Sequence, residues 1–487
     1  MHPELEHAAC YRALLARDAR FDGVFYTGVV STGIFCRPVC PATPPKPENC
    51  VFLPSAAAAH RLGFRPCLRC RPELTPGIAG WRGTASTVSR ALYLICEGAL
   101  NDGNVDGLAT RLGVSARHLR RLFERHVGAS PLAVAQTQRI LFAKKLLGES
   151  RLSMADIAIA AGFGSVRRFN DAMRRTYGRP PGELRRSMHT AAHHTEGVTV
   201  RLPYSPPYDW EAMLGFLASR AIAGVETVAN NRYRRSFACD GAYGTLDVCA
   251  DLPAHQLRAT IRIDRIRALG SVVTRLRRLF DLDADLSAID AHLAHDPLFA
   301  GRVRARPGLR VPGTWDTFEL AVRAVLGQQI SVAAATTLAG RLAAALGQPL
   351  ESAVDGIGLL FPIPAVIATA DLDGIGLTQR RAASLRQLAQ AMRDNPHLLR
   401  PFETLENSIA RLTELPGIGP WTAQYIAMRA LREPDAFPAS DLGLLRALET
   451  PAGRPTPAAL LARAEAWRPW RAYAALRLWL QPDGAPA

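Results

Sequence analysis

Four cysteines near the start of the chain form two closely spaced pairs. Cys36 and Cys40 lie in C-R-P-V-C, and Cys67 and Cys70 lie in C-L-R-C. Two such pairs supply the four thiolates that a tetrahedral site for one Zn²⁺ requires. A shared metal ion would hold this stretch together as one small unit. Both pairs lie among prolines and basic residues, which predicts turns around the cysteines rather than a regular helix or strand.

Spacing alone favours a structural zinc site, because most closed four-cysteine sites only stabilise a fold. The neighbouring sequence adds a second possibility. The segments FYTGVVSTGIFCRPVC and GFRPCLRCRPE, within residues 21–73, resemble the amino-terminal domain of the Ada-type DNA repair and adaptive-response regulators. This resemblance implies that Cys36 accepts a methyl group from a methylated DNA phosphate, and that Arg65 lies on the DNA-binding side.

The chemistry of such a transfer suits a metal-held thiolate, which is a nucleophile at neutral pH. Methylation converts the Cys36 thiolate into an uncharged thioether. Because this removes one negative charge from a surface that approaches phosphates, the affinity for DNA should rise. We therefore expect the damage to act as a signal.

Length and charge are consistent with a DNA partner. At 487 residues the chain is too long for one core and suggests about three or four domains. Its net charge of +16 favours a polyanionic partner. No secretory signal or membrane-spanning apolar run is present, so we expect a cytoplasmic protein without membrane contact. The five remaining cysteines are expected to stay as thiols: Cys10, Cys50, Cys96, Cys239 and Cys249.

An internal repeat occupies residues 84–188. The first copy runs from Val105 to Pro131 and the second from Met154 to Pro181. In each copy a short helix ends at a turn glycine and a second helix follows, which predicts two helix-turn-helix units. The second helices carry the candidate DNA-binding residues Arg117, Arg120, Arg121, Arg167 and Arg168.

The region from Arg111 to Arg186 holds 16 basic against 5 acidic residues. A solvated basic face is the simpler explanation, but the doubled motif favours two recognition helices in the major groove. The segment LLGESRLSMADIAIAAGFGSVRRF is similar to the AraC family of transcriptional activators. That resemblance implies promoter DNA and RNA polymerase as partners.

Residues 189–197, HTAAHHTEG, are predicted to be a polar linker, since no cysteine accompanies the histidines. From 198 to 285 the chain alternates apolar and polar residues in VTVRLPY, YRRSFAC, GTLDVCAD and ATIRIDRI. This alternation predicts antiparallel strands, with one helix at 210–222. We expect a supporting sheet without catalytic residues.

The remainder, 286–487, is predicted to be helical. Its most specific segment, LPGIGPWTAQYIAMRAL, places Gly417 and Gly419 just before a helix, where main-chain N–H groups can hold one DNA phosphate. FPASD with Asp441 follows about twenty residues later. Together with YSPPYDWEAMLGFLASRAIAGVETV, VRAVLGQQISVAAA and AWRPWRAYAALRLWLQPDG, these motifs resemble the AlkA-like 3-methyladenine glycosylases of the helix-hairpin-helix class.

The resemblance implies that Asp441 is the catalytic aspartate and that Trp421, Tyr425 and Trp479 line the base pocket. A cationic alkylated purine leaves easily, so one carboxylate beside the developing oxocarbenium ion suffices. Relatives that also nick the strand carry a lysine where this chain has Trp421, which predicts a monofunctional hydrolase. A helix N-cap is the alternative role of Asp441, and aromatic residues often serve only as core.

Two departures from the families matter. Gln329 stands where a relative would have an apolar wedge, so the residue that fills the gap in the duplex stays open. The P-C-H-R active site of a second methyltransferase domain does not occur anywhere in the chain, so repair of O6-alkylguanine is not expected.

We therefore expect a multidomain α+β protein. Its parts are a zinc-binding methyl-acceptor domain (1–78), an all-α double helix-turn-helix (84–188), a linker (189–197), an antiparallel β plus α domain (198–285) and an all-α helix-hairpin-helix glycosylase domain (286–487). The predicted function is methyl transfer from DNA methylphosphotriesters to Cys36, methylation-enhanced activation of transcription, and excision of bases such as 3-methyladenine. One alternative is a non-enzymatic regulator with structural zinc and an inactive glycosylase fold, and a second is a glycosylase whose amino-terminal half only tethers it to DNA.

Overall fold

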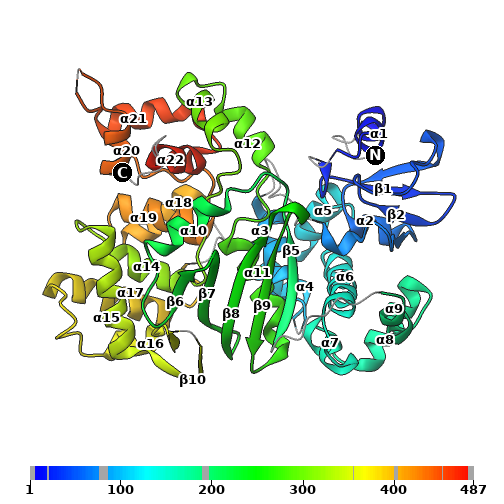
Figure 1. Cartoon of the computed structure of the whole chain (residues 1–487), viewed down its shortest axis with the longest axis horizontal. Coiled ribbons are helices and arrows are strands. Elements are labelled where there is room, and N and C mark those ends of the chain that lie inside the picture. The colour runs from blue at the N-terminus through cyan, green and yellow to red at the C-terminus, as the bar shows by residue number, and fades with distance from the viewer. Residues whose placement is uncertain are drawn as a thin grey trace.

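The computed structural model describes residues 6–18, 21–75, 86–101, 103–188, 197–354, 356–399, 404–451 and 453–480. Figure 1 shows the amino-terminal domain at the upper right, a twisted sheet in the centre and the carboxy-terminal helices at the left. The predicted linker 189–197 lies outside the described residues except for Gly197, as do the boundary at 78–84 and the last residues from 481. Their assignment stays a prediction.

The amino-terminal domain is built around a small sheet with the strand order β3-β1-β2-β4. Its elements are α1 (His7–Leu15), β1 (Tyr26–Val29), β2 (Ile34–Cys36), η2 (Pro47–Asn49), β3 (Cys50–Leu53), α2 (Ala56–Arg61), β4 (Arg65–Pro66) and η3 (Pro72–Leu74). The turns expected around the cysteines are present for three of them, but Cys36 ends strand β2. Apolar residues before Cys36, including the fully buried Phe35, explain the strand.

The repeat region folds into helices as predicted. They are α3 (Ser86–Cys96), α4 (Val105–Arg111), α5 (Ala116–His126), α6 (Pro131–Glu149), α7 (Met154–Ala160), α8 (Val166–Tyr177) and α9 (Pro181–Ser187). Side chains of Ser115 and Ser165 accept hydrogen bonds from the first turns of α5 and α8. These N-caps satisfy main-chain donors that a helix start leaves unpaired, which explains why both helices begin where they do.

The central sheet has the antiparallel order β5-β9-β8-β7-β6. Its elements are β5 (Val198–Pro203), α10 (Trp210–Ala218), β6 (Glu226–Ala229), β7 (Arg232–Cys239), β8 (Ala242–Asp251), η4 (Leu252–Ala254), β9 (Gln256–Ile263), η5 (Ile266–Ala268) and α11 (Leu269–Leu279). Four of these strands match the alternating segments of the sequence. The short strand β6 carries little alternation and was not expected.

The carboxy-terminal domain is mostly helical. Its elements are α12 (Leu286–Leu293), α13 (Pro297–Ala305), α14 (Thr317–Leu326), α15 (Val332–Leu346), β10 (Gln348–Val354), β11 (Ile357–Leu360), α16 (Pro364–Thr369), α17 (Gln379–Asp394), α18 (Leu405–Thr413), α19 (Pro420–Ile426), the π-helix η6 (Ala427–Leu431), α20 (Leu442–Ala447), α21 (Pro457–Ala464), η7 (Glu465–Trp467) and α22 (Arg471–Trp479). The β10–β11 pair is an addition to the helical domain that the sequence did not indicate.

The apolar cores do not follow the predicted domain boundaries. One core belongs to the carboxy-terminal helices, with Phe299 and Trp467 among its buried residues. A second core contains Leu146 of α6 and Phe169 of the second helix-turn-helix unit together with Val200 of the central sheet. This unit and the sheet are therefore packed as one body, and α6 and α7 lie against the sheet domain in Figure 1.

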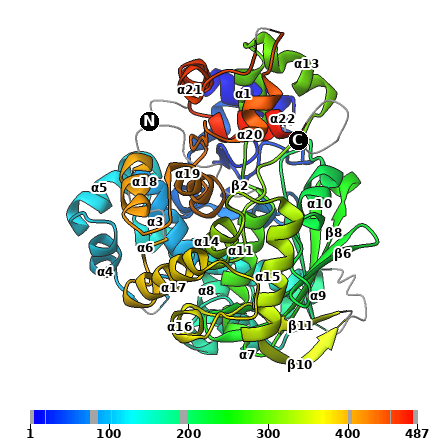
Figure 2. The same ribbon diagram turned by 90° about the vertical axis from the view of Figure 1, so that its left-hand side faces the viewer.

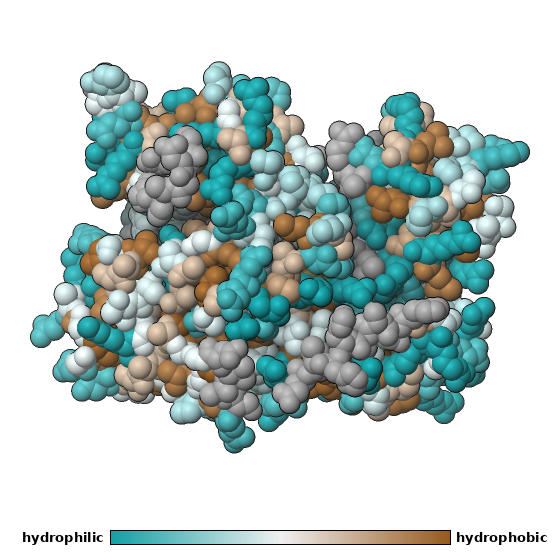
Figure 3. Space-filling view, in the orientation of Figure 1, coloured by the Kyte–Doolittle hydropathy of each residue, from teal (hydrophilic) through white to brown (hydrophobic). Residues whose placement is uncertain are grey.

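Figure 2, seen from the left of Figure 1, shows α15, α17 and α19 toward the viewer. Figure 3 shows hydrophilic residues over the outer edge of the amino-terminal domain, and a notch between this domain and the carboxy-terminal helices. Across the parts of the chain that the structure describes, every helix is too short or too polar to cross a bilayer.

Candidate functional sites

The four cysteines of the candidate metal centre are brought together by strand pairing. Strands β2 and β4 are parallel, with Phe35 opposite Pro66, so Cys36 and Cys67 follow side by side. The N–H of Cys67 donates to the Phe35 carbonyl at 3.0 Å. A turn after β2 then returns the chain so that Cys40 also faces the cluster. The fold therefore assembles a site from residues more than thirty positions apart.

The sulfurs of Cys36, Cys40, Cys67 and Cys70 all lie within 4.8 Å of one another. A tetrahedron with Zn–S bonds of about 2.3 Å requires sulfurs roughly 3.8 Å apart, so the arrangement needs only small adjustments to close on an ion. Four thiol donors and no carboxylate select a soft, tetrahedral metal. The residues fit one Zn²⁺.

The four sulfurs are not equivalent. Cys36 is half-buried, whereas the other three cysteines are buried. Main-chain N–H groups donate to Cys70 Sγ from Arg37 at 3.3 Å and to Cys67 Sγ from Arg69 at 3.4 Å. Among the described residues, no main-chain N–H donates to Cys36 Sγ. Main-chain donors withdraw charge from the sulfurs of Cys67 and Cys70. Cys36 is therefore more electron-rich than these two, and it is also the most exposed of the four cysteines.

Arg37 is a residue of this centre that the sequence reasoning missed. Its side chain donates to the carboxylate of Asp22, with Nε 2.8 Å from Oδ1, and to the carbonyl of Cys70 at 3.1 Å. It thereby holds the two cysteine pairs together from outside the cluster. Its position inside C-R-P-V-C was the available signal, since an arginine between metal ligands has to lie near the site.

The predicted recognition helices both present basic faces. On α5, Leu119 and Phe123 are fully buried, and on α8 Phe169 and Met173 are. The predicted DNA-binding residues lie on the opposite faces and are exposed: Arg117, Arg120, Arg121, Arg167 and Arg168. Arg65 of the amino-terminal domain is exposed as well. This amphipathic arrangement suits helices that lie against a duplex.

The hairpin before α19 exposes main-chain donors. Gly417 has φ of 86°, and a Cβ at this position would lie 2.0 Å from Ser384 Oγ, so only glycine fits the turn. Gly419 is the N-cap of α19. Within the described part of the chain, the N–H groups of Gly417 and Gly419 donate to no protein acceptor, and both residues are exposed. The turn can therefore offer these N–H groups to an anion.

Asp441 is held by three donors. Its Oδ2 accepts from Trp421 Nε1 at 2.9 Å, and its Oδ1 accepts from Trp479 Nε1 at 2.8 Å. Oδ1 also accepts from the N–H of Leu444 at 3.1 Å, which makes Asp441 the N-cap of α20. The side chain is half-buried. The N-cap role thus coexists with an orientation toward the two tryptophans.

The three predicted base-pocket residues lie together around this carboxylate. The rings of Trp421 and Tyr425 are stacked, with centroids 5.4 Å apart and planes at 7°. The ring of Trp479 is tilted against Tyr425 at 6.4 Å. All three side chains are half-buried, so part of each aromatic side chain remains accessible.

Two arginines that contact the Tyr425 hydroxyl, Arg220 and Arg429, were not predicted. Arg429 donates to the Tyr425 hydroxyl at 2.8 Å, and Arg220 also interacts with this hydroxyl. Burial raises the pKa of Tyr425, but the two guanidiniums outweigh burial and leave this pKa below its usual value. Arg429 lies four residues after Tyr425 on one helical face, which was a signal. The sequence gives no such signal for Arg220, because Arg220 lies about two hundred residues before Tyr425.

The turn between α14 and α15 adjoins the hairpin. Gln328 Nε2 donates to the Gly417 carbonyl at 2.7 Å and to Thr422 Oγ1 at 3.0 Å. The next residue, Gln329, has φ of 58° and is exposed. The polar side chain at the expected wedge position is therefore presented beside the hairpin, and the identity of the wedge stays open.

Comparison with protein families matches four models along the chain. They are "Metal binding domain of Ada" over residues 9–73, "Helix-turn-helix domain" over 108–187, "AlkA N-terminal domain" over 199–316 and "HhH-GPD superfamily base excision DNA repair protein" over 322–472. Each match falls on a region where the sequence had indicated the corresponding resemblance.

Some relatives match the whole chain and others match part of it. The chain is 41% identical over 486 residues to the probable bifunctional transcriptional activator/DNA repair enzyme AlkA of Mycobacterium tuberculosis, covering 98% of this chain and 97% of that protein. It is 37% identical over 292 residues to DNA-3-methyladenine glycosylase 2 of Escherichia coli, covering 58% of this chain and 99% of the relative. Among solved structures, 3-methyladenine DNA-glycosylase from Archaeoglobus fulgidus matches 58% of this chain and 98% of its own, with a TM-score of 0.52 at 22% identity, which is a likeness of fold.

Proposed function

The chain belongs to the bifunctional transcriptional activator/DNA repair enzymes, and we propose that it senses and repairs DNA alkylation with two separate sites. Cys36 accepts a methyl group from a DNA methylphosphotriester, and the methylated protein activates transcription, with RNA polymerase as partner. The site at Asp441 excises alkylated bases such as 3-methyladenine. The observation that carries the proposal is the Asp441 carboxylate, aimed by two indole N–H groups beside a stacked aromatic pair.

At the first site, the Cys36 sulfur attacks the methyl carbon of the phosphotriester in line with the departing oxygen. The S–C bond forms as the C–O bond breaks, and the phosphodiester anion leaves with the electron pair. The four cysteines would hold one zinc ion, which would keep their sulfurs deprotonated at neutral pH. Support for Cys36 comes from its half-burial and from the N–H donors at Cys67 and Cys70, which make those two sulfurs poorer nucleophiles.

At the second site, the extruded base stacks on the Trp421 and Tyr425 faces, which favour a cationic ring. The glycosidic bond breaks, and the base leaves as a neutral molecule with the bonding electrons. The Asp441 carboxylate stabilises the positive charge that develops on the sugar and orients a water molecule, which adds to C1′ and releases one proton to the surrounding solvent.

No amine is available at the residue that follows the hairpin, because this position is Trp421 and its indole is bonded to Asp441. A Schiff base with the sugar would require such an amine. The product is therefore an abasic site in an intact strand, and the enzyme is a monofunctional hydrolase.

The proposal is tested with the full-length protein and duplex DNA that carries 3-methyladenine and methylphosphotriesters. Wild type should release free 3-methyladenine, leave a strand that breaks only after alkali, and gain one methyl group on the peptide that contains Cys36. Asp441→Asn should lose base release and keep methylation. Cys36→Ser should show the reverse, with zinc content measured for both variants.

Cys50→Ser, a buried cysteine outside the metal set, is the matched control and should retain both activities. A wild-type protein that releases no base at enzyme excess would support the non-enzymatic alternative. Strand breakage without alkali would contradict monofunctional hydrolysis, and methylation of Cys67 in place of Cys36 would contradict the assignment of the acceptor.

A further inference from the structure

One arginine joins the activator half of the chain to the repair half. The guanidinium of Arg278, on α11, lies over the ring of Tyr93 on α3, 4.3 Å from its centroid, and donates to the Tyr93 hydroxyl. The same guanidinium donates through Nη2 to the carbonyl of Ala430 at 3.1 Å. Tyr93 in turn donates to Glu97 one turn further along α3. Arg278 is thus held from both sides.

The carbonyl that Arg278 holds belongs to the π-helix η6, which directly follows α19. A π-helix has wider turns than an α-helix and often lies at a functional site. The residue before Ala430 is Arg429, whose Nη1 donates to the Tyr425 hydroxyl at 2.8 Å. Tyr425 stacks on Trp421, and Trp421 donates to Asp441. Four consecutive contacts therefore lead from Arg278 to the carboxylate.

A second connection joins the same two segments. Arg429 also donates to the carbonyls of Pro312 and Gly313 at 2.9 and 2.8 Å. Gly313 packs directly on the carbonyl of Arg278, since a Cβ at this position would lie 2.3 Å from that oxygen. The backbone of Arg278 therefore supports the loop that anchors Arg429, while its side chain supports the π-helix.

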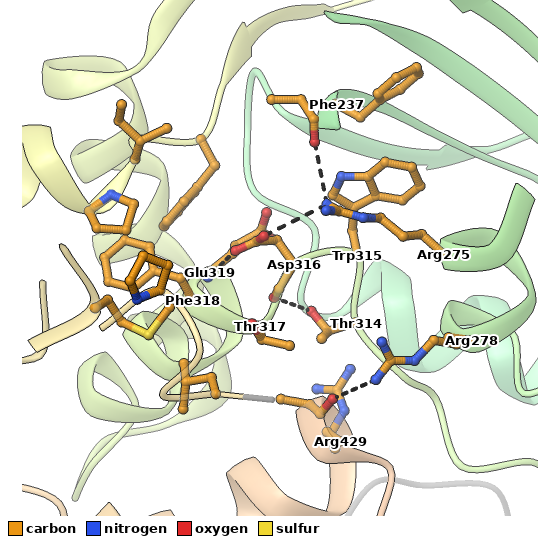
Figure 4. Close-up of a pocket in the computed structure, with 18 of the residues that line it drawn as sticks. Phe237, Arg275, Arg278, Thr314, Trp315, Asp316, Thr317, Phe318, Glu319 and Arg429 are labelled. Atoms are coloured by element: carbon orange, nitrogen blue, oxygen red, sulfur yellow. Dashed lines mark hydrogen bonds and ion pairs between the residues drawn. The ribbon is translucent and has the colours of Figure 1, made fainter. Parts of the chain in front are cut away.

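The space around these residues is not filled. A cavity of about 230 Å³ lies between α3, the central sheet and the carboxy-terminal helices, and Tyr93, Arg278 and Arg429 are among its lining residues. Figure 4 shows Arg278 and Arg429 at one end of it, with a hydrogen bond from Arg278 beside Arg429. In a close-packed interior a side chain has one position, whereas this cavity leaves a guanidinium room for a second. The orientation of Arg278 therefore depends on its partners.

We propose that Arg278 is a positioning residue for base excision, and that Tyr93 sets its orientation. By holding the Ala430 carbonyl, Arg278 fixes the π-helix and with it the Arg429 guanidinium that orients Tyr425 in the base pocket. The inference rests on the proposed glycosylase activity. It gives the activator half of the chain a direct part in the geometry of the repair site.

The kinetic test uses full-length protein under single-turnover conditions. Arg278→Gln should lower the excision rate constant about tenfold, the loss expected for one misplaced contact near 1.4 kcal/mol, with less than a twofold change in DNA affinity. Tyr93→Phe should lower the rate constant severalfold. The double variant should be no slower than Arg278→Gln, because both changes break one connection. Arg278→Lys should recover part of the rate, since it retains one donor.

Arg277→Gln is the matched control, because Arg277 lies on the same helix but bonds to Asp283 and Pro203. Hydrogen exchange of residues 425–431 provides a readout independent of catalysis. Exchange there should be faster in Arg278→Gln and Tyr93→Phe and unchanged in Arg277→Gln. Equal exchange in all variants would overturn the proposal even if wild type excises bases. A wild type without base release would refute the proposed function, and the exchange data would still decide the positioning role.

Discussion

At the scale of single residues, the Asp441 carboxylate is defined by what donates to it. An ionised carboxylate offers about four acceptor positions, and two indole N–H groups and one main-chain N–H occupy three of them. Only one lone pair is left to face a reacting group. Indole donates but cannot accept, so neither tryptophan competes for the proton of an incoming water.

Replacing Trp421 by phenylalanine separates two roles of the indole, which are to orient the Asp441 carboxylate and to stack on Tyr425. Trp421→Phe keeps an aromatic face on Tyr425 and removes the N–H that reaches Oδ2. A hydrogen bond to a charged group contributes about 1.5–3 kcal/mol, so excision should slow by roughly 10- to 100-fold. Trp470→Phe, a tryptophan that packs on Tyr473 away from Asp441, is the control and should excise like wild type. Equal rates for both variants would show that the indole only stacks.

At the scale of helices and strands, local signals predicted the elements well. Turn glycines mark both helix-turn-helix units, and alternation marks four strands of the central sheet. Two features depend on distant pairing and were missed. Cys36 lies in a strand because β1 and β4 flank it, and β6 is a strand because β7 provides a partner.

The functional sites also contain some residues that the sequence predicts and others that only the tertiary fold brings together. The hairpin glycines lie in one short motif, and the metal set and the aromatic cluster carry short motifs that the family resemblances connect, so these residues could be proposed from the sequence. Arg220 and the Arg278–Tyr93 contact were not, because each is made by elements that only the tertiary fold brings together. A motif fixes residues that act through neighbours in sequence, and it cannot specify residues that act through neighbours in space.

One contact between elements predicts a pH dependence. His60 on α2 hydrogen-bonds Thr137 on α6 through Nδ1, and its Nε2 is buried without a partner. Burial lowers the pKa of His60 from 6.5 to about 4. The unfolded chain therefore binds a proton between pH 6.5 and 4 that the folded chain does not, so stability should fall as the pH drops through this range, by on the order of 3 kcal/mol at pH 4.

Urea denaturation of wild type and His60→Gln between pH 7.5 and 4.5 checks this expectation. Glutamine can still bond Thr137 but does not titrate, so the variant should lose less stability on acidification. Protonation of the metal-binding cysteines affects both proteins alike, and the difference between the two curves isolates His60. Parallel curves would show that His60 is protonated in the folded protein.

At the scale of the whole molecule, α6 connects three parts of the chain. Its Lys144 contacts Glu73 of the amino-terminal domain at 2.6 Å, and its Glu149 accepts from the N–H of Arg201 on β5 at 3.0 Å. Lys145 donates to the Arg201 carbonyl. The shared apolar core between the second helix-turn-helix unit and the sheet strengthens this junction. We therefore expect the amino-terminal domain, the helix-turn-helix region and the sheet to unfold together.

Lys144→Met tests this cooperativity. The side chains of Lys144 and Glu73 are each 1% exposed, so removal of the lysine leaves a buried carboxylate that has lost its buried partner and keeps its ion pair with Arg71. Breaking a buried pair costs about 3–5 kcal/mol, whereas replacing both partners by apolar residues is often neutral. Urea denaturation should show this loss for Lys144→Met and a recovery of at least half of it for Lys144→Met with Glu73→Leu. Lys46→Met, at an exposed lysine, is the control and should stay within about 0.5 kcal/mol of wild type.

Zinc release and tryptophan fluorescence should report the same shifted midpoint in Lys144→Met, because α6 transmits the loss to both sides. Two separate midpoints would mean that the halves unfold independently, and the rigid link through α6 would then be wrong.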